Sequence, residues 1–347
     1  MLKFALVGCG RISTRHADVL SDDLLPGASL VAVCDVKPDR SAATGKKYGV
    51  PWFEDMHLMM QSVETDVVVV LTESGHHPQD VLELSKYGKH IVVEKPMALS
   101  STDADQMISA CEKAGIQLFV VKQNRYNQPV QKLKKALDDG AFGKLVLGSV
   151  RVRWCRTQDY YDLDAWRGTK KLDGGVLANQ ASHHLDLLEW MLGTPKTVTA
   201  MTSRALANIE TDDTAIATIR FANGALGLVE ATTATRPTDL EGSLSVLGSL
   251  GSVVIGGFSV NRLETWNFDQ ASSAASSDLA GFSENPPNVY GFGHLSFYRD
   301  VIDSITEGSP PKIDGHEGRK SVALLETIYK SAELGQELEV PKSESDA

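Results

Sequence analysis

The sequence is poor in cysteine, with four among 347 residues, and none stands in a C-x-x-C pair or at a metal-ligand spacing from histidine. We therefore expect free thiols in a reducing compartment and no metal site. No apolar run approaches the roughly 20 residues that a membrane-spanning helix needs. The chain enters a predicted strand without the basic and apolar segments of a secretory signal, so a cytoplasmic protein without a membrane partner is expected.

The sequence also has fewer basic than acidic side chains. The sequence has 34 lysines and arginines against 45 aspartates and glutamates, a formal net charge of −11. This balance disfavours a nucleic-acid partner, although it allows a local basic pocket for a small anion. The hydrophobic share of 42% is ordinary for a globular protein, and the length predicts about two domains.

Strands and helices alternate through the first third of the sequence, which predicts a Rossmann domain with a doubly wound, mostly parallel sheet over residues 1–122. Helices become rare after it. Residues 123–347 are predicted to form an α+β domain with a large, mostly antiparallel open sheet, whose free face suggests oligomerisation. Its expected strands are 144–154, 197–205, 212–222, 225–235, 240–247 and 251–266, and helices are expected at 293–306 and 315–334.

A glycine-rich turn follows the first predicted strand, with the spacing G-x-G-x-x-S from Gly8 to Ser13. Gly8 would permit a tight turn, and Gly10 would let a pyrophosphate approach the N-terminus of the next helix. The second strand ends in Asp35, where an acid binds the ribose hydroxyls of NAD and repels the 2′-phosphate of NADP. NAD is therefore the expected cofactor. The alternative for Asp35 is a helix N-cap.

The run His90-Ile91-Val92-Val93-Glu94-Lys95-Pro96 is the centre of the predicted site. Its apolar residues suit a buried parallel strand, and ligands of such sheets bind at the carboxyl ends of strands. Lys95 therefore lies where chemistry is expected, followed by a proline that fixes φ and can be cis. A surface lysine at a strand end is the alternative. Thr72 and His77 follow the fourth strand at the same edge, and His77 is expected to line the site or cap a helix.

A second polar cluster follows Gly174-Gly175. If the chain is helical from about Asn179, then Asn179, His183 and Asp186 share one face, which places an amide and a carboxylate beside an imidazole. This arrangement is typical of a base with its orienting groups. A structural histidine is the alternative for His183, and we expect His184 to be structural.

Basic and aromatic residues interleave upstream of this cluster. Arginine suits phosphate or carboxylate groups, and aromatic faces suit a base or a sugar. An exposed strand with ordinary counter-charges is the alternative. The residues are Arg151, Arg153, Arg156, Tyr160, Tyr161, Trp166 and Arg167.

In this order, Gly8-x-Gly10, Asp35, Glu94-Lys95-Pro96 and the Gly-Gly…His183…Asp186 run resemble the Gfo/Idh/MocA family of sugar oxidoreductases, over essentially the whole chain. Within the family, four segments look like the UDP-N-acetyl-2-amino-2-deoxyglucuronate dehydrogenases, which oxidise C3 of a nucleotide sugar in the synthesis of lipopolysaccharide sugars. The segments are Gln123–Asn127, Tyr160-Tyr161, Trp166–Thr169 and Asn179–His184.

The resemblance implies tightly held NAD, a UDP-sugar substrate, a homotetramer or dimer packed through its sheets, and 2-oxoglutarate as a reoxidant used by some relatives. Lys95 and His183 would remove the proton of the C3 hydroxyl while its hydride moves to the cofactor. The implied cofactor contacts are Gly8, Gly10, Arg11, Ile12, Asp35, Thr72, His77, Glu94, Lys95, Gln123, Trp166 and Arg167. The implied substrate contacts are Lys95, Arg125, Tyr126, Arg156, Tyr160, Asn179 and His183.

Two positions depart from the family pattern. Asn179 stands where many members have aspartate, so acid–base chemistry would rest on Lys95 and His183, and Glu73 adds a charge to the loop after the fourth strand. Three other functions remain open at this point. One is a sugar or inositol dehydrogenase of the same family that acts on a free polyol, and another is a non-catalytic regulator that senses dinucleotide. The third is a reductase that runs the reaction in the opposite direction, because the chemistry is reversible.

Overall fold

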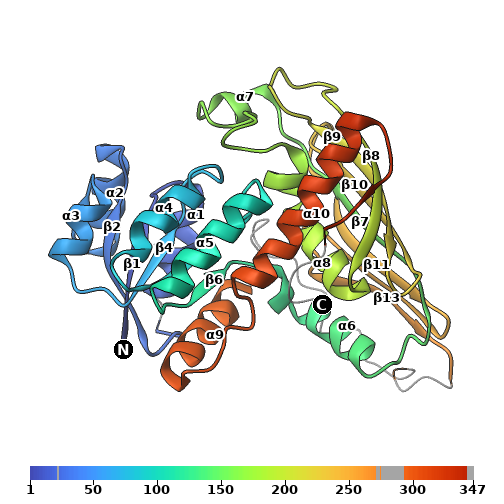
Figure 1. Cartoon of the computed structure of the whole chain (residues 1–347), viewed down its shortest axis with the longest axis horizontal. Helices are drawn as coiled ribbons and strands as arrows, with labels where there is room; N and C mark the ends of the chain where they lie inside the picture. Colours follow the sequence, from blue (N-terminus) through green and yellow to red (C-terminus); the bar gives the residue numbers. More distant parts are fainter. Residues whose placement is uncertain (22, 271–273, 275–292, 342–347) are drawn as a thin grey trace. The chain divides into compact units, whose positions relative to one another are not determined.

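The computed structural model describes residues 1–21, 23–270, 274 and 293–341. The chain forms two compact units (Figure 1). Unit 1 comprises Met1–Val121 and His294–Val322, and unit 2 comprises Lys122–Gly293 and Ala323–Ala347. Among the described residues, no helix combines the length and the apolar character needed to cross a bilayer.

Unit 1 is built on a six-stranded sheet of order β3-β2-β1-β4-β5-β6, in which every pairing is parallel. The run Val67–Val70 is buried at every position, as expected for a strand that helices cover on both faces. This sheet confirms the predicted Rossmann domain. The strands are β1 Leu2–Val7, β2 Ala28–Cys34, β3 Trp52–Phe53, β4 Val67–Val70, β5 His90–Val93 and β6 Leu118–Val120.

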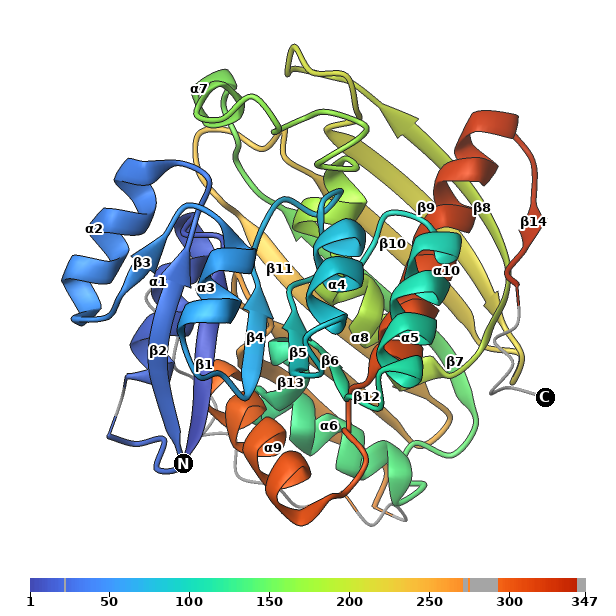
Figure 2. The ribbon, with the colours of Figure 1, turned by 60° about the vertical axis from the view of Figure 1, so that its left-hand side comes forward.

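Capping residues mark the starts of α3 and α5 and the end of α2 in unit 1. The Asp55 carboxylate accepts a hydrogen bond from the Leu58 N–H at the start of α3, and the Ser100 hydroxyl accepts one from Asp103 in α5. Gly49 ends α2 in the left-handed conformation. Figure 2 shows α4 and α5 side by side. The helices are α1 Arg11–Leu20, α2 Pro38–Tyr48, α3 Met56–Ser62, α4 His77–Ser85 and α5 Ser101–Lys113.

The chain returns to unit 1 near its end through α9, Gly293–Glu307. Tyr298 of this helix is fully buried and packs edge-on against Phe4 of β1, with ring centroids 5.6 Å apart. The predicted division into residues 1–122 and 123–347 did not assign this C-terminal segment to the first domain.

Unit 2 contains an eight-stranded sheet of order β13-β12-β11-β7-β10-β9-β8-β14, antiparallel except for the pairing of β7 with β10. Buried and exposed residues alternate along β9, so one face is covered and the other is open, as predicted. The strands are β7 Leu145–Arg153, β8 Pro195–Ser203, β9 Thr214–Phe221, β10 Leu226–Thr232, β11 Glu241–Gly248, β12 Gly251–Gly256, β13 Arg262–Phe268 and β14 Leu338–Glu339.

Helix α8, Ser182–Leu192, packs on β7 and β11 at the covered face. Its leucines meet Gly148 of β7, where a Cβ atom would lie 2.5 Å from the Leu192 side chain. The other helical elements are a 3₁₀ turn η1 Gln123–Tyr126, α6 Gln128–Asp138, α7 Gln158–Asp162, a π-helical turn η2 Val176–Gln180 and α10 Gly315–Leu334.

Two predicted elements differ from the structure. The segment 251–266 was expected as one strand, but it forms β12 and β13, because Gly256 and Gly257 begin a turn there and Gly257 has φ of 84°. The helix expected from about Asn179 is interrupted, since Asn179 belongs to η2 and α8 begins only at Ser182.

Gly8 offers a test of why the first turn requires glycine. At Gly8, φ is 100° and a Cβ atom would lie 2.7 Å from the Leu71 carbonyl carbon, whereas Gly49 has φ of 69° and open space around it. Both alanine substitutions cost about 1 kcal/mol or more in backbone strain, and only Gly8→Ala adds the collision with the Leu71 backbone, just after β4. We expect urea unfolding to show a larger loss of stability for Gly8→Ala. Equal losses would show that the collision is relieved without cost.

Candidate functional site

The turn between β1 and α1 has the form that a dinucleotide-binding loop needs. The backbone N–H of Gly8 donates to the Cys34 carbonyl at 2.8 Å, which ties the turn to the end of β2. Gly10 is the N-cap of α1, and no side chain of the described residues caps that helix. A Cβ atom at Gly10 would meet nothing within 4 Å. The helix N-terminus, including Arg11 and Ile12, therefore fits a pyrophosphate.

Asp35 lies at the end of β2 and faces this turn. Its Oδ2 accepts the Cys9 N–H at 2.7 Å, and its Oδ1 accepts the Lys37 N–H at 2.8 Å. The N-cap of α2 is Lys37, so the N-cap alternative for Asp35 is wrong. Each carboxylate oxygen keeps a second lone pair, which fits the ribose diol of NAD.

The segment after β5 places a buried glutamate next to a partly exposed lysine. Glu94 is 5% exposed, its Oε2 accepts the Lys95 backbone N–H at 2.8 Å, and its Oε1 lies 2.9 Å from His16 Nε2. Burial alone would raise the pKa of Glu94, but the His16 hydrogen bond and the nearby positive charges outweigh burial and lower it to about 2. Lys95 is partly exposed, and the Lys95–Pro96 peptide bond is cis.

The loop after β4 contacts the Lys95 segment through His77. This histidine is 1% exposed, with Nε2 at 2.9 Å from the Thr72 carbonyl oxygen and Nδ1 at 2.9 Å from that of Pro96. His77 thus links the two loops. It is the first residue of α4 rather than its cap. The unexpected charge of Glu73 is paired with His76 at 3.2 Å, and Thr72 donates to Asp80 at 2.6 Å.

In unit 2, a buried ion cluster connects η1 with α8. The Asp186 carboxylate binds the Arg125 guanidinium at 2.9 and 2.7 Å and the Lys122 ammonium at 2.5 Å. Burial opposes ionisation of Asp186, but the two cations hold its pKa well below the usual range. Arg125 also lies 4.8 Å from the centroid of the Trp190 ring. The predicted substrate contact of Arg125 stays a prediction.

The residues flanking Arg125 in η1 differ in exposure. Gln123 is 2% exposed, and its Oε1 has no hydrogen-bond partner among the described residues, which suits the predicted ligand contact. Tyr126 is partly exposed, so its ring is accessible.

Two carboxyl groups, of the buried Asp173 and the partly buried Asp212, lie beside the turn η2. Asp173 accepts the Gly168 N–H at 2.6 Å and bonds to Asn179, and burial raises its pKa to about 6. Asp212 accepts the Val176 N–H at 3.3 Å. Gly175 has φ of 92°, and a Cβ atom there would lie 2.4 Å from Asp212. The paired glycines therefore let η2 close over the carboxyl groups.

The two neighbouring histidines of α8 have different surroundings. His183 is partly exposed, while His184 is 1% exposed and packs edge-on against Trp154 with ring centroids 5.8 Å apart. This contact agrees with a structural role for His184 and leaves His183 as the accessible imidazole.

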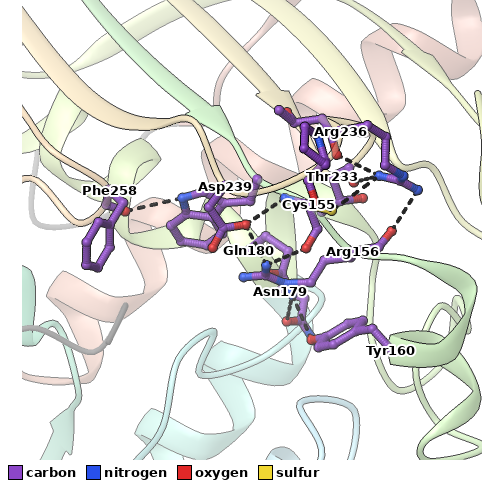
Figure 3. Close-up of polar contacts among 12 residues, drawn as sticks. Cys155, Arg156, Tyr160, Asn179, Gln180, Thr233, Arg236, Asp239 and Phe258 are labelled. Atoms are coloured by element: carbon purple, nitrogen blue, oxygen red, sulfur yellow. Dashed lines mark hydrogen bonds and ion pairs between the residues drawn. The ribbon is translucent and has the colours of Figure 1, made fainter. Parts of the chain in front are cut away.

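The arginine–aromatic segment forms one connected cluster (Figure 3). Arg156 donates to Gln180 at 3.2 Å and to Asp239 at 3.0 Å, and Gln180 donates to the Tyr160 hydroxyl at 3.0 Å and to Asn179 at 2.6 Å. The hydrogen bonds therefore join Arg156 and Tyr160 to Asn179.

Two guanidinium groups lie over the Tyr160 ring of this cluster. Arg156 lies 5.4 Å from its centroid, and Arg167 lies 4.4 Å from it and 4.7 Å from that of Trp166. Arg167 Nε has no hydrogen-bond partner among the described residues. Arg151 and Arg153 are different, since they pair with Glu230 and Glu241 on the sheet, as the counter-charge alternative stated.

Comparisons with known proteins cover both units. Residues 2–122 match the family model described as "Oxidoreductase family, NAD-binding Rossmann fold", and residues 134–340 match its "C-terminal alpha/beta domain". The chain belongs to the Gfo/Idh/MocA family. It is an oxidoreductase with NAD as its cofactor, which confirms these two predictions. The regulator alternative is not supported.

Among solved structures, the WlbA dehydrogenase from Chromobacterium violaceum in complex with NADH and UDP-GlcNAcA is 39% identical, with a TM-score of 0.92 over 99% of this chain and 96% of that one. The WlbA dehydrogenase from Bordetella pertussis with the same ligands is also 39% identical, with a TM-score of 0.88 and 99% coverage of both chains. A D-apiose dehydrogenase of Paraburkholderia graminis is 28% identical over 99% of this chain and 91% of its own length.

Sequence reasoning missed three residues of the site. Gln180 was treated only as part of a motif, and Asp173 carried a usable signal because it precedes the Gly-Gly pair. Asp239 lies 83 positions from Arg156, so no local pattern could pair them.

The raised pKa of Asp212 predicts a pH-dependent stability. Burial raises this pKa from 3.8 to about 7, so between these values the native state holds a proton that the unfolded chain has lost. The free energy of unfolding therefore falls as pH rises through this window. In urea unfolding, Asp212→Asn should gain stability relative to the wild type on going from about pH 4.5 to about pH 7.5. The control variant Asp159→Asn, at an exposed position, should not gain stability over this pH range. An Asp212→Asn variant whose stability relative to the wild type is equal at both pH values would refute the raised pKa.

Proposed function

We propose that this oxidoreductase converts the C3 hydroxyl of UDP-N-acetylglucosaminuronate (UDP-GlcNAcA) to the 3-keto sugar, a step in the synthesis of lipopolysaccharide and O-antigen sugars. The observation that carries the proposal is the 39% identity, over 99% of the chain, to two dehydrogenases whose structures contain NADH and UDP-GlcNAcA. Because the reaction uses NAD and a nucleotide sugar, the proposal includes a cytoplasmic location.

The cluster of Arg156, Tyr160 and Arg167 supports a substrate of this kind. Guanidinium groups bind phosphate and carboxylate oxygens, and aromatic rings such as those of Tyr160 and Trp166 suit a uracil or a sugar. Arg156 is held by Asp239 and Gln180, so it is preorganised and loses little side-chain entropy on binding. A UDP-uronate carries both a pyrophosphate and a carboxylate. We assign substrate contacts to Arg156 and Tyr160 of this cluster and to Arg125, Tyr126 and Asn179.

Lys95 and His183 are the proposed acid–base groups. They hold the substrate hydroxyl by hydrogen bonds and accept its proton as the carbon–oxygen double bond forms. Bound NAD supplies the hydride acceptor for the C3 hydrogen. Both side chains are partly exposed, so substrate can reach them, whereas Glu94 and His184 are buried beside them in sequence. The remaining proposed cofactor contacts are Gly8, Gly10, Arg11, Ile12, Asp35, Thr72, His77, Glu94, Gln123, Trp166 and Arg167.

Two further proposals concern partners. The open face of the eight-stranded sheet carries exposed apolar side chains, including Ile216 and Leu226, and would pack against a second copy in a homotetramer or dimer. 2-Oxoglutarate would reoxidise the reduced cofactor.

A free sugar is the second candidate substrate. The 28% identity to a D-apiose dehydrogenase over nearly the whole chain favours it. The arginine–aromatic cluster has no evident role with an uncharged polyol, so UDP should inhibit turnover only if the substrate is a nucleotide sugar.

Absorbance at 340 nm tests the substrate directly. We expect a rise when purified protein and NAD are mixed with UDP-GlcNAcA, or product formation that requires added 2-oxoglutarate. D-Apiose and myo-inositol serve as comparison substrates. Turnover of either of these together with no reaction of UDP-GlcNAcA would contradict the proposed substrate and leave the family chemistry in place.

Lys95→Met tests the catalytic assignment. The variant keeps a side chain of similar length without the amine, so NAD should bind with nearly unchanged affinity, measured by fluorescence titration. Turnover should fall by about 10²–10⁴-fold, the usual contribution of a positioned proton acceptor. Lys89→Met, at a partly exposed position just before β5, is the matched control and should remain active. Near-normal turnover of Lys95→Met would refute the assignment.

A further inference from the structure

Four buried polar residues of unit 1 form a cluster behind Lys95. His16 comes from α1, Glu94 follows β5, and His294 and Tyr298 lie one turn apart on α9. His16, His294 and Tyr298 are fully buried, and Glu94 is 5% exposed. Polar groups are buried in this way only when they are hydrogen-bonded, so the cluster needs an explanation.

The contacts run in one line from α9 to the catalytic segment. The Tyr298 hydroxyl lies 2.6 Å from His16 Nδ1, His16 Nε2 lies 2.9 Å from Glu94 Oε1, and Glu94 Oε2 accepts the Lys95 backbone N–H at 2.8 Å. Burial raises the pKa of Tyr298 well above its ordinary value, so its hydroxyl keeps its proton. A proton on His16 Nε2 satisfies every group, since Tyr298 then donates to Nδ1 and His16 donates to Glu94.

Metal binding is a second role that the same residues could have. Ligand atoms of His16, Glu94 and His294 lie within 4.8 Å of one another. However, both nitrogens of His16 and both carboxylate oxygens of Glu94 already bond to protein groups. A metal would have to break the His16–Glu94 bond, so the geometry favours the hydrogen-bond chain.

We infer that Tyr298 and His16 are positioning residues for Lys95, acting through Glu94. The inference rests on the proposed function, because it takes Lys95 as the proton acceptor. His16 stands on the helix whose N-terminus is proposed to bind the pyrophosphate. The chain of hydrogen bonds therefore connects the segment that bears Lys95 to helix α1. Its far end is Tyr298 of α9, which lies 282 positions after His16 in the sequence.

Tyr298→Phe is the first test. The ring remains to pack against Phe4 and Phe297, while the donor to His16 is lost. We expect kcat to fall about tenfold, the effect of roughly one buried hydrogen bond, with the NAD dissociation constant and the substrate KM within about twofold of the wild type. Tyr87→Phe is the matched control, because it removes a tyrosine–histidine hydrogen bond of 2.9 Å, to His57, in the same unit. Its kcat should not change.

His16 provides a rescue experiment. Glutamine places its amide nitrogen near the position of Nε2 and can still donate to Glu94, whereas leucine cannot. His16→Leu should lose at least as much kcat as Tyr298→Phe, and His16→Gln should recover most of it. A purely structural role would lower the melting temperature and leave kcat per folded enzyme unchanged.

The outcomes separate the two proposals. Wild-type kcat in Tyr298→Phe and His16→Leu, with Lys95→Met inactive, would overturn the positioning role alone. Metal found in the purified protein at about one equivalent and lost in His16→Leu would also overturn it. An active Lys95→Met would instead remove the proposed function on which the inference rests.

Discussion

A carboxylate buried at the carboxyl end of β5 in unit 1 constrains the segment that bears Lys95. Glu94 is almost inaccessible to water, and burial alone would raise its pKa, but the His16 hydrogen bond and the nearby positive charges lower it to about 2. The Lys95 backbone N–H donates to the other carboxylate oxygen. Removing either donor would leave a charge in an apolar interior, which is costly. The conformation of the residue that bears the amine is therefore coupled to the packing of α1 and α9. His77 adds a second connection, from the loop after β4 to Pro96.

Unit 2 uses carboxyl groups in a different way. Asp186 is ionised between Lys122 and Arg125, whereas burial raises the pKa of both Asp173 and Asp212. Asp173 accepts the Gly168 N–H and bonds to Asn179, and Asp212 accepts the Val176 N–H of η2. An asparagine at position 179 suits this setting, because an amide beside the Asp173 carboxyl group adds no second negative charge. The departure from the family pattern thus has a local electrostatic reason.

Much of the fold could be predicted because it depends on local patterns. The valine run of β4, the glycine turn at Gly8 and the alternation along β9 each follow from residues close together in sequence. The turn at Gly257 was not predicted, because a turn of only a few residues hardly changes the local amino-acid composition of the segment. The π-helical turn before α8 was also missed, since its cause is the fit of Gly175 over Asp212, which lies far along the chain.

The site was predictable to the extent that it uses sequence motifs. Lys95, His183, Asp35 and the glycines follow a recognisable order, whereas Asp239 and Tyr298 reach their partners across 83 and 282 positions. Such pairings are set by tertiary packing. The identity of the substrate is a question of chemistry rather than of fold.

The transfer of deuterium from a labelled substrate tests the central claim most directly. UDP-GlcNAcA labelled with deuterium at C3 is mixed with enzyme and NAD under single-turnover conditions, and the cofactor is analysed by mass spectrometry. The account predicts that the label appears in the reduced nicotinamide and that a substrate labelled at C4 transfers none. Reduced cofactor without deuterium from the C3-labelled sugar would contradict it.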